Sequence, residues 1–394
     1  MSRPIRLGVA GLGRGFMLML PTLSSHPLVE LVAAADPRPE ARAKFAADFG
    51  ASIYDSVEDL CADPSVEAVY IATPHQFHVE NVRSSARHKK HVMVEKPMAL
   101  TLADCQAMID AATDAGIHLL VGHSHSYDAP YLATRALIAG GEFGPVRMIT
   151  ATNFTDFLYR PRRAEELDTA QGGGVVFSQG AHQIDIVRLL GGGLARSIRA
   201  ATGRWDPRRP TEGAYNAFVE FDGGLSATLT YNGTAHFDTD EFCDWTGELG
   251  HSKDQQAYGG ARTALRKIAT PAEEAALKNT RAYGLAEMPS QAPASHNHFG
   301  MVIASCERAD LRPLPRGVMI YADEVRRLQA LPPPSVPRAE VIDELYHAVV
   351  HHVAPLHSGA WGMATVEMCL ALLASAQEGQ EIALHHQVAV PALR

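Results

Sequence analysis

The sequence contains little lysine, little cysteine and no long run of hydrophobic residues. Only seven of its 35 basic residues are Lys, at positions 44, 89, 90, 96, 253, 267 and 278, and the other 28 are Arg. This skew is typical of codon bias, so each Lys marks a position where the usual choice was not made. The five cysteines are scattered and form no C-x-x-C pair, so neither a disulfide framework nor a thiolate metal site is indicated.

Hydrophobic residues make up 46% of the 394 residues, yet the sequence predicts no membrane-spanning segment. The most apolar late run, Met368–Ala374, is far shorter than the ~20 residues that a bilayer requires. The N-terminal residues Met1–Arg6 are not followed by the apolar core and cleavage site of a signal peptide. A formal net charge of −9 argues against a nucleic-acid partner, which usually meets a basic stripe. We therefore expect a cytoplasmic protein with neither a membrane nor a nucleic-acid partner.

The length predicts two domains, since roughly 100–200 residues per domain is usual. In the first third, short and almost uncharged β-rich runs alternate with amphipathic stretches, which predicts crossover units and a parallel sheet covered on both faces. This first domain is expected to span residues 1–124. Its expected strands are Ile5–Ala10, Leu28–Ala35, Ala68–Ala72, His91–Val94 and Ile117–Val121, and its expected helices are Arg38–Phe49, Phe77–Arg87 and Leu102–Ala115.

The pattern after about Val121 predicts a second domain, residues 125–394, with a mostly antiparallel sheet. Phe221-Asp-Gly-Gly-Leu225 is a hairpin signal, because turn residues separate two strand-like runs. Residues 251–297 are polar and Ala-rich without a clear period, and we interpret them as an insertion. The expected elements are a helix at Tyr131–Ala139, extended runs at Val146–Phe154, Ala214–Phe221, Leu225–Tyr231 and Met301–Ser305, and helices at Arg338–Val353 and Ala364–Glu378, the last able to pack back towards the first domain.

A glycine-rich turn follows the first expected strand, in the run Gly8-Val-Ala-Gly11-Leu-Gly13-Arg14. Such a turn lets backbone amides and a helix N-terminus approach a pyrophosphate. The third glycine of the usual pattern falls on Phe16, which is a departure. Asp36 ends the second strand and can accept hydrogen bonds from the adenosine ribose, while Arg38 nearby could favour a 2′-phosphate instead. The sequence therefore predicts NAD as cofactor, with NADP possible, although Asp36 could also be a simple turn or helix-cap residue.

Two further turns follow strands at the same expected edge of the sheet. Thr73 and Pro74 are predicted to cap and start a helix, with His78 one turn inside it. Glu95-Lys96-Pro97 ends the expected strand His91–Val94, and the proline keeps Lys96 extended. An ammonium at Lys96 could stabilise an alkoxide that loses hydride, or relay its proton. We expect all of these residues to line the cofactor site, but His78 could be a plain surface histidine and Glu95-Lys96 a surface ion pair.

These motifs, followed by Val121-Gly122-His123, resemble the Gfo/Idh/MocA family of nicotinamide-dependent oxidoreductases. The run Gly173–Asp185 resembles the second-domain motif of that family. The resemblance implies a Rossmann domain, an α/β domain with an open sheet, catalysis in the cleft between them, and a homodimer or homotetramer. By position, Lys96 and His182 match the catalytic Lys and His of the family. Ser178 stands where many sugar- and inositol-oxidising members have Asp, so a Lys–Asp–His arrangement is in doubt.

Positive charge collects at Arg160, Arg162 and Arg163, which suggests an anionic small-molecule substrate, because Arg binds carboxylates with two parallel hydrogen bonds. A solvated basic loop is the alternative. Together with Ser178 and His123 these arginines are our expected substrate ligands, and a second group, Arg204, Arg208 and Arg209, follows later. The C-terminal part most resembles members that oxidise phthalate 4,5-cis-dihydrodiol to a catechol.

Three alternatives stay open at this point. A sugar or inositol dehydrogenase or a reductase of the same family would use the same motifs. A regulator that senses the dinucleotide without turnover would need neither Lys96 nor His182. A metal site among the late histidines would use the helical spacing of His347 and His351, together with His352 or His357, but no H-E-x-x-H frame accompanies them and we expect no metal.

Overall fold

The computed structural model describes residues 3–285 and 293–393. These residues form two compact units. Unit 1 contains residues 3–123, 279–285 and 336–366, and unit 2 contains residues 124–278, 293–335 and 367–393. Each unit is therefore assembled from three separate stretches of chain, and the segment around residue 280 belongs to unit 1.

Unit 1 is built on a sheet of six parallel strands in the order β3-β2-β1-β4-β5-β6. The order reverses between β1 and β4, which is the switch point where doubly wound folds bind ligands. The expected doubly wound parallel sheet is therefore confirmed, with β3 as a strand that the sequence patterns did not reveal. The strands are β1 Ile5–Ala10, β2 Val29–Ala35, β3 Ser52–Tyr54, β4 Ala68–Ile71, β5 His91–Val94 and β6 Leu119–Val121.

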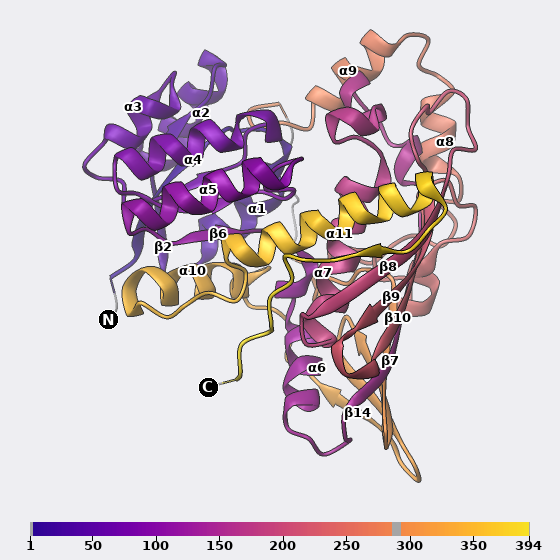
Figure 1. Cartoon of the computed structure of the whole chain (residues 1–394). Helices are drawn as coiled ribbons and strands as arrows, with labels where there is room; N and C mark the ends of the chain where they lie inside the picture. Colours follow the sequence, from indigo (N-terminus) through magenta and orange to yellow (C-terminus); the bar gives the residue numbers. More distant parts are fainter. Residues whose placement is uncertain (1–2, 286–292, 394) are drawn as a thin grey trace. The chain divides into compact units, whose positions relative to one another are not determined.

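The helices of unit 1 cover both faces of this sheet. Helices α4 and α5 lie side by side along one face, and α10 lies beyond the opposite face (Figure 1). The start of α10 is fastened to α1, because the Thr22 hydroxyl donates to the Pro337 carbonyl at 2.6 Å and Arg338 donates to the Leu18 carbonyl at 3.0 Å. The helices are α1 Arg14–Ser25, α2 Pro39–Phe49, α3 Val57–Ala62, α4 His78–Arg87, α5 Leu102–Ala115 and α10 Ala339–His351.

Unit 2 is built on a nine-stranded sheet in the order β14-β13-β12-β11-β7-β10-β9-β8-β15. Every neighbouring pair is antiparallel except β7 and β10. The expected open, mostly antiparallel sheet is confirmed, including the hairpin between β9 and β10. The strands are β7 Val146–Phe154, β8 Ala195–Gly203, β9 Ala214–Phe221, β10 Ser226–Asn232, β11 Met301–Cys306, β12 Ala309–Leu314, β13 Gly317–Ala322, β14 Arg326–Ala330 and β15 Ile382–Ala383.

Helices α6, Ala129–Ala139, and α7, Ala181–Leu190, pack against strands of the second sheet. Burial alternates along β9 and β10, so one face is buried and the other is open, with Met148 and Phe218 among its exposed side chains. The stretch 251–297 showed no clear period in the sequence, yet it contains two short helices. They are α8, Gly260–Leu265, and α9, Pro271–Asn279.

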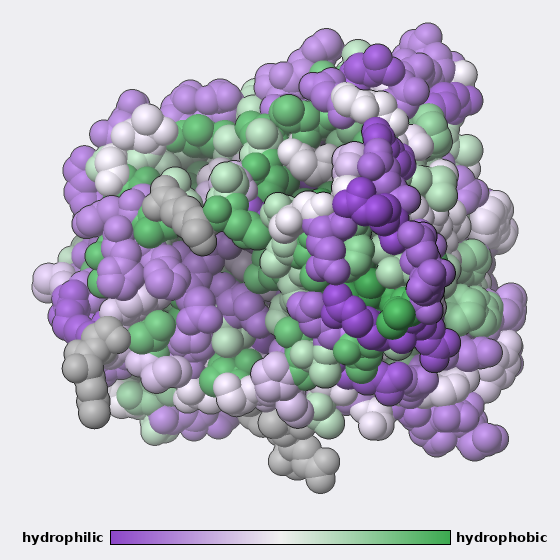
Figure 2. Space-filling model, turned by 90° about the horizontal axis from the view of Figure 1, so that it is seen from below, coloured by the Kyte–Doolittle hydropathy of each residue, from purple (hydrophilic) through white to green (hydrophobic). Residues whose placement is uncertain are grey.

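Among the described residues, one helix is long and apolar enough to cross a membrane, namely α11, Gly359–Glu378. The apolar run Met368–Ala374, noted in the sequence, is only the most apolar part of this helix. Within the structure 67% of the 18-residue window of α11 is buried, which is typical of a core helix. The surface seen in Figure 2 carries hydrophobic patches separated by hydrophilic residues, and scattered apolar side chains of this kind are normal on a folded chain.

Candidate active site

The turn between β1 and α1 can be formed only with glycine at its first position. Gly11 has a φ of +93°, and a Cβ there would lie 2.9 Å from the backbone nitrogen of Thr73. Gly13 caps α1 without a side-chain hydrogen bond, and nothing lies within 4 Å of where its Cβ would be. Helix α1 begins at Arg14 without a side-chain cap, and a helix N-terminus that follows such a turn fits the pyrophosphate of a dinucleotide.

Two neighbouring positions serve packing. A Cβ on Gly8 would lie 3.1 Å from side-chain atoms of Leu60 and Val66, so this glycine lets α3 approach the sheet. Phe16, at the place of the third fingerprint glycine, is fully buried against the ring of Phe45. The departure from the glycine pattern is therefore compensated by an aromatic contact below the turn.

Asp36, which follows the end of β2, is hydrogen-bonded to the backbone of this turn. The Asp36 carboxylate accepts hydrogen bonds from the backbone nitrogens of Leu12, at 2.7 Å, and Arg38, at 2.9 Å. The Arg38 guanidinium donates to both carboxylate oxygens, from Nε at 2.9 Å and from Nη2 at 3.2 Å. The structure thus brings together the predicted glycine turn, Asp36 and Arg38, with the acid and the arginine paired.

His78 links the loops that follow β4 and β5, and it is buried rather than on the surface. Its ring nitrogens lie 3.0 Å from the Thr73 carbonyl oxygen and 3.1 Å from the Met98 carbonyl oxygen. Burial lowers the pKa of this ring. The expected helix cap is wrong, because Pro74 is the cap of a short 3-10 turn and the Thr73 hydroxyl instead accepts from Asn81 at 2.9 Å.

Glu95 precedes Lys96 and is buried, with its carboxylate beside a tyrosine and a histidine. The Tyr70 hydroxyl donates to it at 2.5 Å, and the His123 ring lies 3.3 Å away. Burial alone would raise the pKa of Glu95, but His123, Tyr70 and Lys96 outweigh it and hold the pKa below its usual value. Glu95 and His123 are thus tied to each other, while Lys96 is only partly buried at the strand's carboxyl end.

In unit 2, His182 stands at the start of α7, and only 4% of it is exposed. Its Nδ1 lies 3.4 Å from the Ser124 hydroxyl. The rings of His125 and Phe299 lie 4.8 and 5.3 Å from it, centroid to centroid. The His182 ring is therefore packed against two rings, those of His125 and Phe299, and lies within reach of the Ser124 hydroxyl.

His125 is not among the site residues expected from the sequence. It nevertheless forms stronger polar contacts than the neighbouring His182. Its Nδ1 donates to Asp128 at 2.6 Å and its Nε2 to Glu248 at 3.2 Å. Burial alone would lower the pKa of His125, but the two carboxylates raise it. The spacing from His125 to Asp128 could have been noticed, whereas Glu248 lies 123 positions away.

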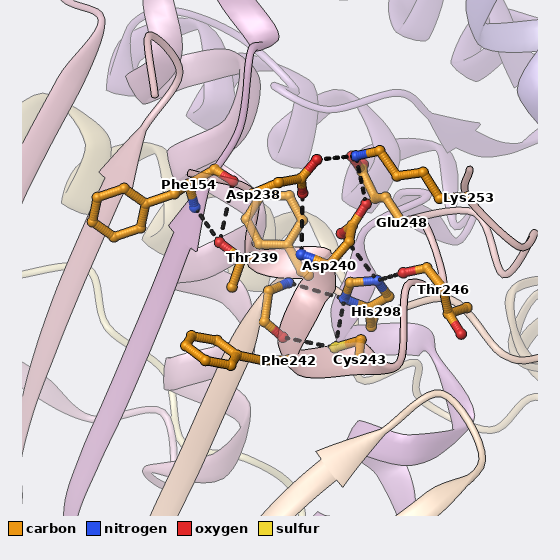
Figure 3. A network of polar contacts seen from close by, with 12 residues as sticks. Phe154, Asp238, Thr239, Asp240, Phe242, Cys243, Thr246, Glu248, Lys253 and His298 are labelled. Carbon is orange, nitrogen blue, oxygen red and sulfur yellow. Dashed lines mark hydrogen bonds and ion pairs between the residues drawn. The ribbon is translucent and has the colours of Figure 1, made fainter. Parts of the chain in front are cut away.

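The loop that carries Glu248 is fixed by a second polar network (Figure 3). His298 donates to the Thr246 carbonyl at 2.8 Å and lies 3.4 Å from the Cys243 sulfur. Lys253 donates to Asp240 at 3.0 Å and to Asp238. These contacts tie the loop to the start of β11, so the position of Glu248 does not depend on His125 alone.

The three arginines predicted to bind substrate have different surroundings. Arg162 is 8% exposed, donates to the Phe157 carbonyl at 2.7 Å and lies over the Phe157 ring, so its guanidinium is committed to the protein. Arg163 is partly exposed and faces Glu165 at 3.5 Å. Arg160 donates from Nε to Asp156 at 3.1 Å, and burial is outweighed by Glu248 and Asp156, which raise its pKa. We therefore narrow the expected anion ligands to Arg160 and Arg163.

A buried ion cluster explains why Arg162 and Arg209 are structural. Glu274 of α9 accepts from the Arg162 backbone nitrogen at 2.7 Å and from the Arg209 guanidinium at 2.8 Å. Lys278 of the same helix pairs with Glu166 at 2.9 Å, and burial lowers the Lys278 pKa to about 8. Helix α9 thus holds the arginine-rich loop, residues 160–163, in place through Glu274 and Lys278. Arg208, of the same second group, is exposed on Asp206.

Ser178 lies in a π-helical turn, Val176–Gly180, that leads into α7. Its hydroxyl donates to the Gly174 carbonyl. Asp185, within α7, accepts from Ser126 and pairs with Arg188 at 3.7 Å. Single π turns are frequent at functional sites because they re-aim the following side chains, here those of His182 and its neighbours.

Comparison with known proteins gives matches over both units. Residues 5–123 match the model of an oxidoreductase family with an NAD-binding Rossmann fold, and residues 131–252 match the GFO/IDH/MocA C-terminal domain. The chain belongs to the Gfo/Idh/MocA family of oxidoreductases. NAD is therefore the cofactor of this family's Rossmann fold, and the chain is a dehydrogenase-type enzyme.

Individual known proteins are similar to this chain over nearly its whole length. A 1-carboxy-3-chloro-3,4-dihydroxycyclohexa-1,5-diene dehydrogenase of Comamonas testosteroni is 45% identical over 94% of both chains. A crystal structure from Bordetella bronchiseptica RB50 is 39% identical, with a TM-score of 0.91 over 96% of this chain and 100% of that one. The WlbA dehydrogenase from Bordetella pertussis, 20% identical, shares the fold with a TM-score of 0.68 over 97% and 99% of the two chains.

The His125–Glu248 pair predicts a characteristic pH dependence of stability. His125 and Arg160 outweigh burial and hold the pKa of Glu248 at about 2, so its contribution is present above its unfolded value and is lost as the pH falls towards 2. The contribution of His125, whose pKa is raised, is lost as the pH rises above its unfolded value of about 6.5. Glu248→Gln should therefore lower the free energy of unfolding by roughly 1.5–3 kcal/mol between about pH 5 and 6.

Urea unfolding across pH measures this difference, with Glu241→Gln, an exposed residue of the same loop region, as the control that should stay near the parent value. An equal loss at pH 3 and pH 6 for Glu248→Gln would contradict the assignment of a charged pair.

Proposed function

We propose that this enzyme oxidises a carboxylated cyclohexadiene cis-diol to the corresponding catechol, with NAD+ as the hydride acceptor. The observation that carries the proposal is the 45% identity over 94% of both chains to a 1-carboxy-3-chloro-3,4-dihydroxycyclohexa-1,5-diene dehydrogenase. The site of unit 2 supports it, because His182 is enclosed by rings and Arg160 offers positive charge. Loss of hydride from one CH–OH carbon gives a ketone, which tautomerises to the aromatic ring.

Two residues perform the proposed chemistry on the substrate. His182 accepts the hydroxyl proton as the C–O bond becomes a carbonyl. Lys96, at the carboxyl end of β5, stabilises the developing alkoxide with its ammonium. Bound NAD+ would supply the hydride acceptor, and Gly11, Gly13 and the N-terminus of α1 would hold its pyrophosphate, while Asp36 would accept hydrogen bonds from the ribose. The gain of aromaticity relaxes the need for a carboxylate at Ser178.

Arg160 is our proposed anchor for the substrate carboxylate. Its bond to Asp156 uses Nε, so the paired terminal nitrogens of the guanidinium can bind a carboxylate. Arg163 borders the same loop and adds positive charge. His123 and Glu95 act by holding each other beside Lys96, and Ser178 by shaping the turn before His182.

The proposal extends to assembly and location. A homodimer or homotetramer would cover the open face of the second sheet, where Met148, Phe218 and Tyr321 are exposed. The five cysteines are all free, which suits the reducing cytoplasm. We propose that residues 1–124 form most of the cofactor domain and residues 125–394 most of the substrate domain, with residues 279–285 and 336–366 joining the first.

The substrate class is tested by steady-state assays of NADH formation. The purified enzyme should turn over carboxylated aromatic cis-dihydrodiols with a far higher kcat/KM than inositol or aldoses. A higher kcat/KM for a polyol would favour the sugar or inositol alternative. Binding of NAD+ without turnover of any alcohol in the panel would favour a dinucleotide-sensing regulator.

The role of Lys96 is tested by Lys96→Met, which removes the ammonium and keeps most of the apolar stem. Turnover should fall by about 10²–10⁴-fold, the usual contribution of a proton-handling group, while the Kd of NAD+ measured by calorimetry stays within a few fold. Lys267→Met, at an exposed position, is the matched control. Near-normal turnover of Lys96→Met would remove Lys96 from the mechanism.

The role of Arg160 is tested by Arg160→Gln. The KM of a carboxylated diol should rise roughly 10- to 100-fold, equivalent to about 1.5–3 kcal/mol for hydrogen bonds to a charged group, with kcat largely retained. Arg208→Gln, which removes an exposed arginine paired with Asp206, should leave the KM unchanged. If Arg160→Gln does the same, the carboxylate is bound elsewhere.

A further inference from the structure

Residues 279–285 lie against the cofactor turn of unit 1, although they come from the predicted insertion. They fall outside both matched family regions, 5–123 and 131–252. At their centre Tyr283 is only 3% exposed. Its ring meets Phe16 edge-on at 5.3 Å and lies 6.1 Å from Phe45, and its hydroxyl donates to Asp48.

The backbone of Tyr283 is bonded to the same groups that hold the cofactor acid. Its nitrogen donates to the Leu12 carbonyl at 3.1 Å. Its carbonyl accepts from Arg38 Nη1 at 3.3 Å, while Arg38 Nη2 donates to the Leu12 carbonyl at 2.9 Å. With Nε and Nη2 also on Asp36, every nitrogen of the Arg38 guanidinium is engaged.

This arrangement has a consequence for the adenosine end of the cofactor. An acid at the end of β2 binds a free ribose 2′-hydroxyl, whereas a nearby arginine can accommodate a 2′-phosphate if it turns outward. Here Arg38 could turn outward only by giving up its bonds to Asp36, Leu12 and Tyr283. The side-chain cluster around Tyr283 makes that turn costly, because it fixes the carbonyl that Arg38 binds.

We propose that residues 279–285 form part of the adenosine-side cofactor site and select NAD over NADP by holding Arg38 on Asp36. Tyr283 is then a positioning residue, since it acts through Arg38. The inference depends on the NAD site of unit 1 and not on the proposed substrate, so cofactor binding without substrate tests it independently.

The test measures the Kd of NAD+, NADP+ and ADP-ribose for the full chain by calorimetry. The parent should bind NAD+ more tightly than NADP+. In Tyr283→Ala the affinities for NAD+ and ADP-ribose should fall about tenfold, the equivalent of one hydrogen bond to a charged group, while NADP+ binds equally well or better. Tyr258→Ala, the same change at a residue of the insertion that is 75% exposed, should leave all three values unchanged.

Tyr283→Phe separates the ring from the hydroxyl. It keeps the contacts with Phe16 and Phe45 and loses only the bond to Asp48, so it should retain most of the preference for NAD+. If Tyr283→Ala does not fold, Gly284→Val provides the second variant, because Gly284 has a φ of +87° that a β-branched residue strongly disfavours. An unchanged NAD+ to NADP+ ratio in a folded variant, or a parent that prefers NADP+, would overturn the proposal and leave residues 279–285 as a structural strap.

Discussion

The strands of the parallel sheet end at the same level, and the cofactor site of unit 1 depends on this alignment. Ala10 is aligned with Ala35 on one side and with Ile71 on the other, and Ile71 is aligned with Val94. All four strands therefore end in one row, and each delivers the next residues to the same edge. Those residues are Gly11, Asp36, Thr73 and the Glu95-Lys96 pair, so side chains spread over some 85 positions become neighbours of one ligand-binding edge.

The loops at this edge are held by polar side chains that do not need to touch the ligand. His78 joins two loops through carbonyl oxygens, and Glu95 is held between a tyrosine and a histidine. Unit 2 follows the same principle with charge, because His125 stands between two carboxylates and Glu274 binds two arginine residues. A buried charge is costly unless it is paired, so each of these groups fixes its partners in place.

The sequence was sufficient for features that depend on local pattern or on motif order. Strand–helix alternation, the glycine turn and Asp36 led to the correct sheet, and Glu95-Lys96-Pro97 to the correct family. It was insufficient where partners are distant in the chain. Nothing near Arg162 announced Glu274, 112 positions away, which binds its backbone nitrogen. The Arg162 guanidinium looked like a substrate ligand because its acceptor, the Phe157 carbonyl, carries no sequence signal. Similarly, His78 was expected at the cofactor site, with a surface position left open, because its carbonyl partners Thr73 and Met98 carry no sequence signal. Strands β12 and β14 were missed because polar residues, and in β12 a proline, interrupt their apolar pattern.

The fastening of α10 to α1 bears on the order in which the chain can fold. The parallel sheet is complete once residue 121 has emerged from the ribosome, but the Thr22 hydroxyl and the Leu18 carbonyl find their partners only with residues 337 and 338. During synthesis the nascent sheet must therefore wait, with one helix face uncovered, for more than 200 residues of intervening chain. A fragment ending at residue 124 would keep that face permanently exposed, which makes it a poor choice for isolating the cofactor half and a natural target for chaperones.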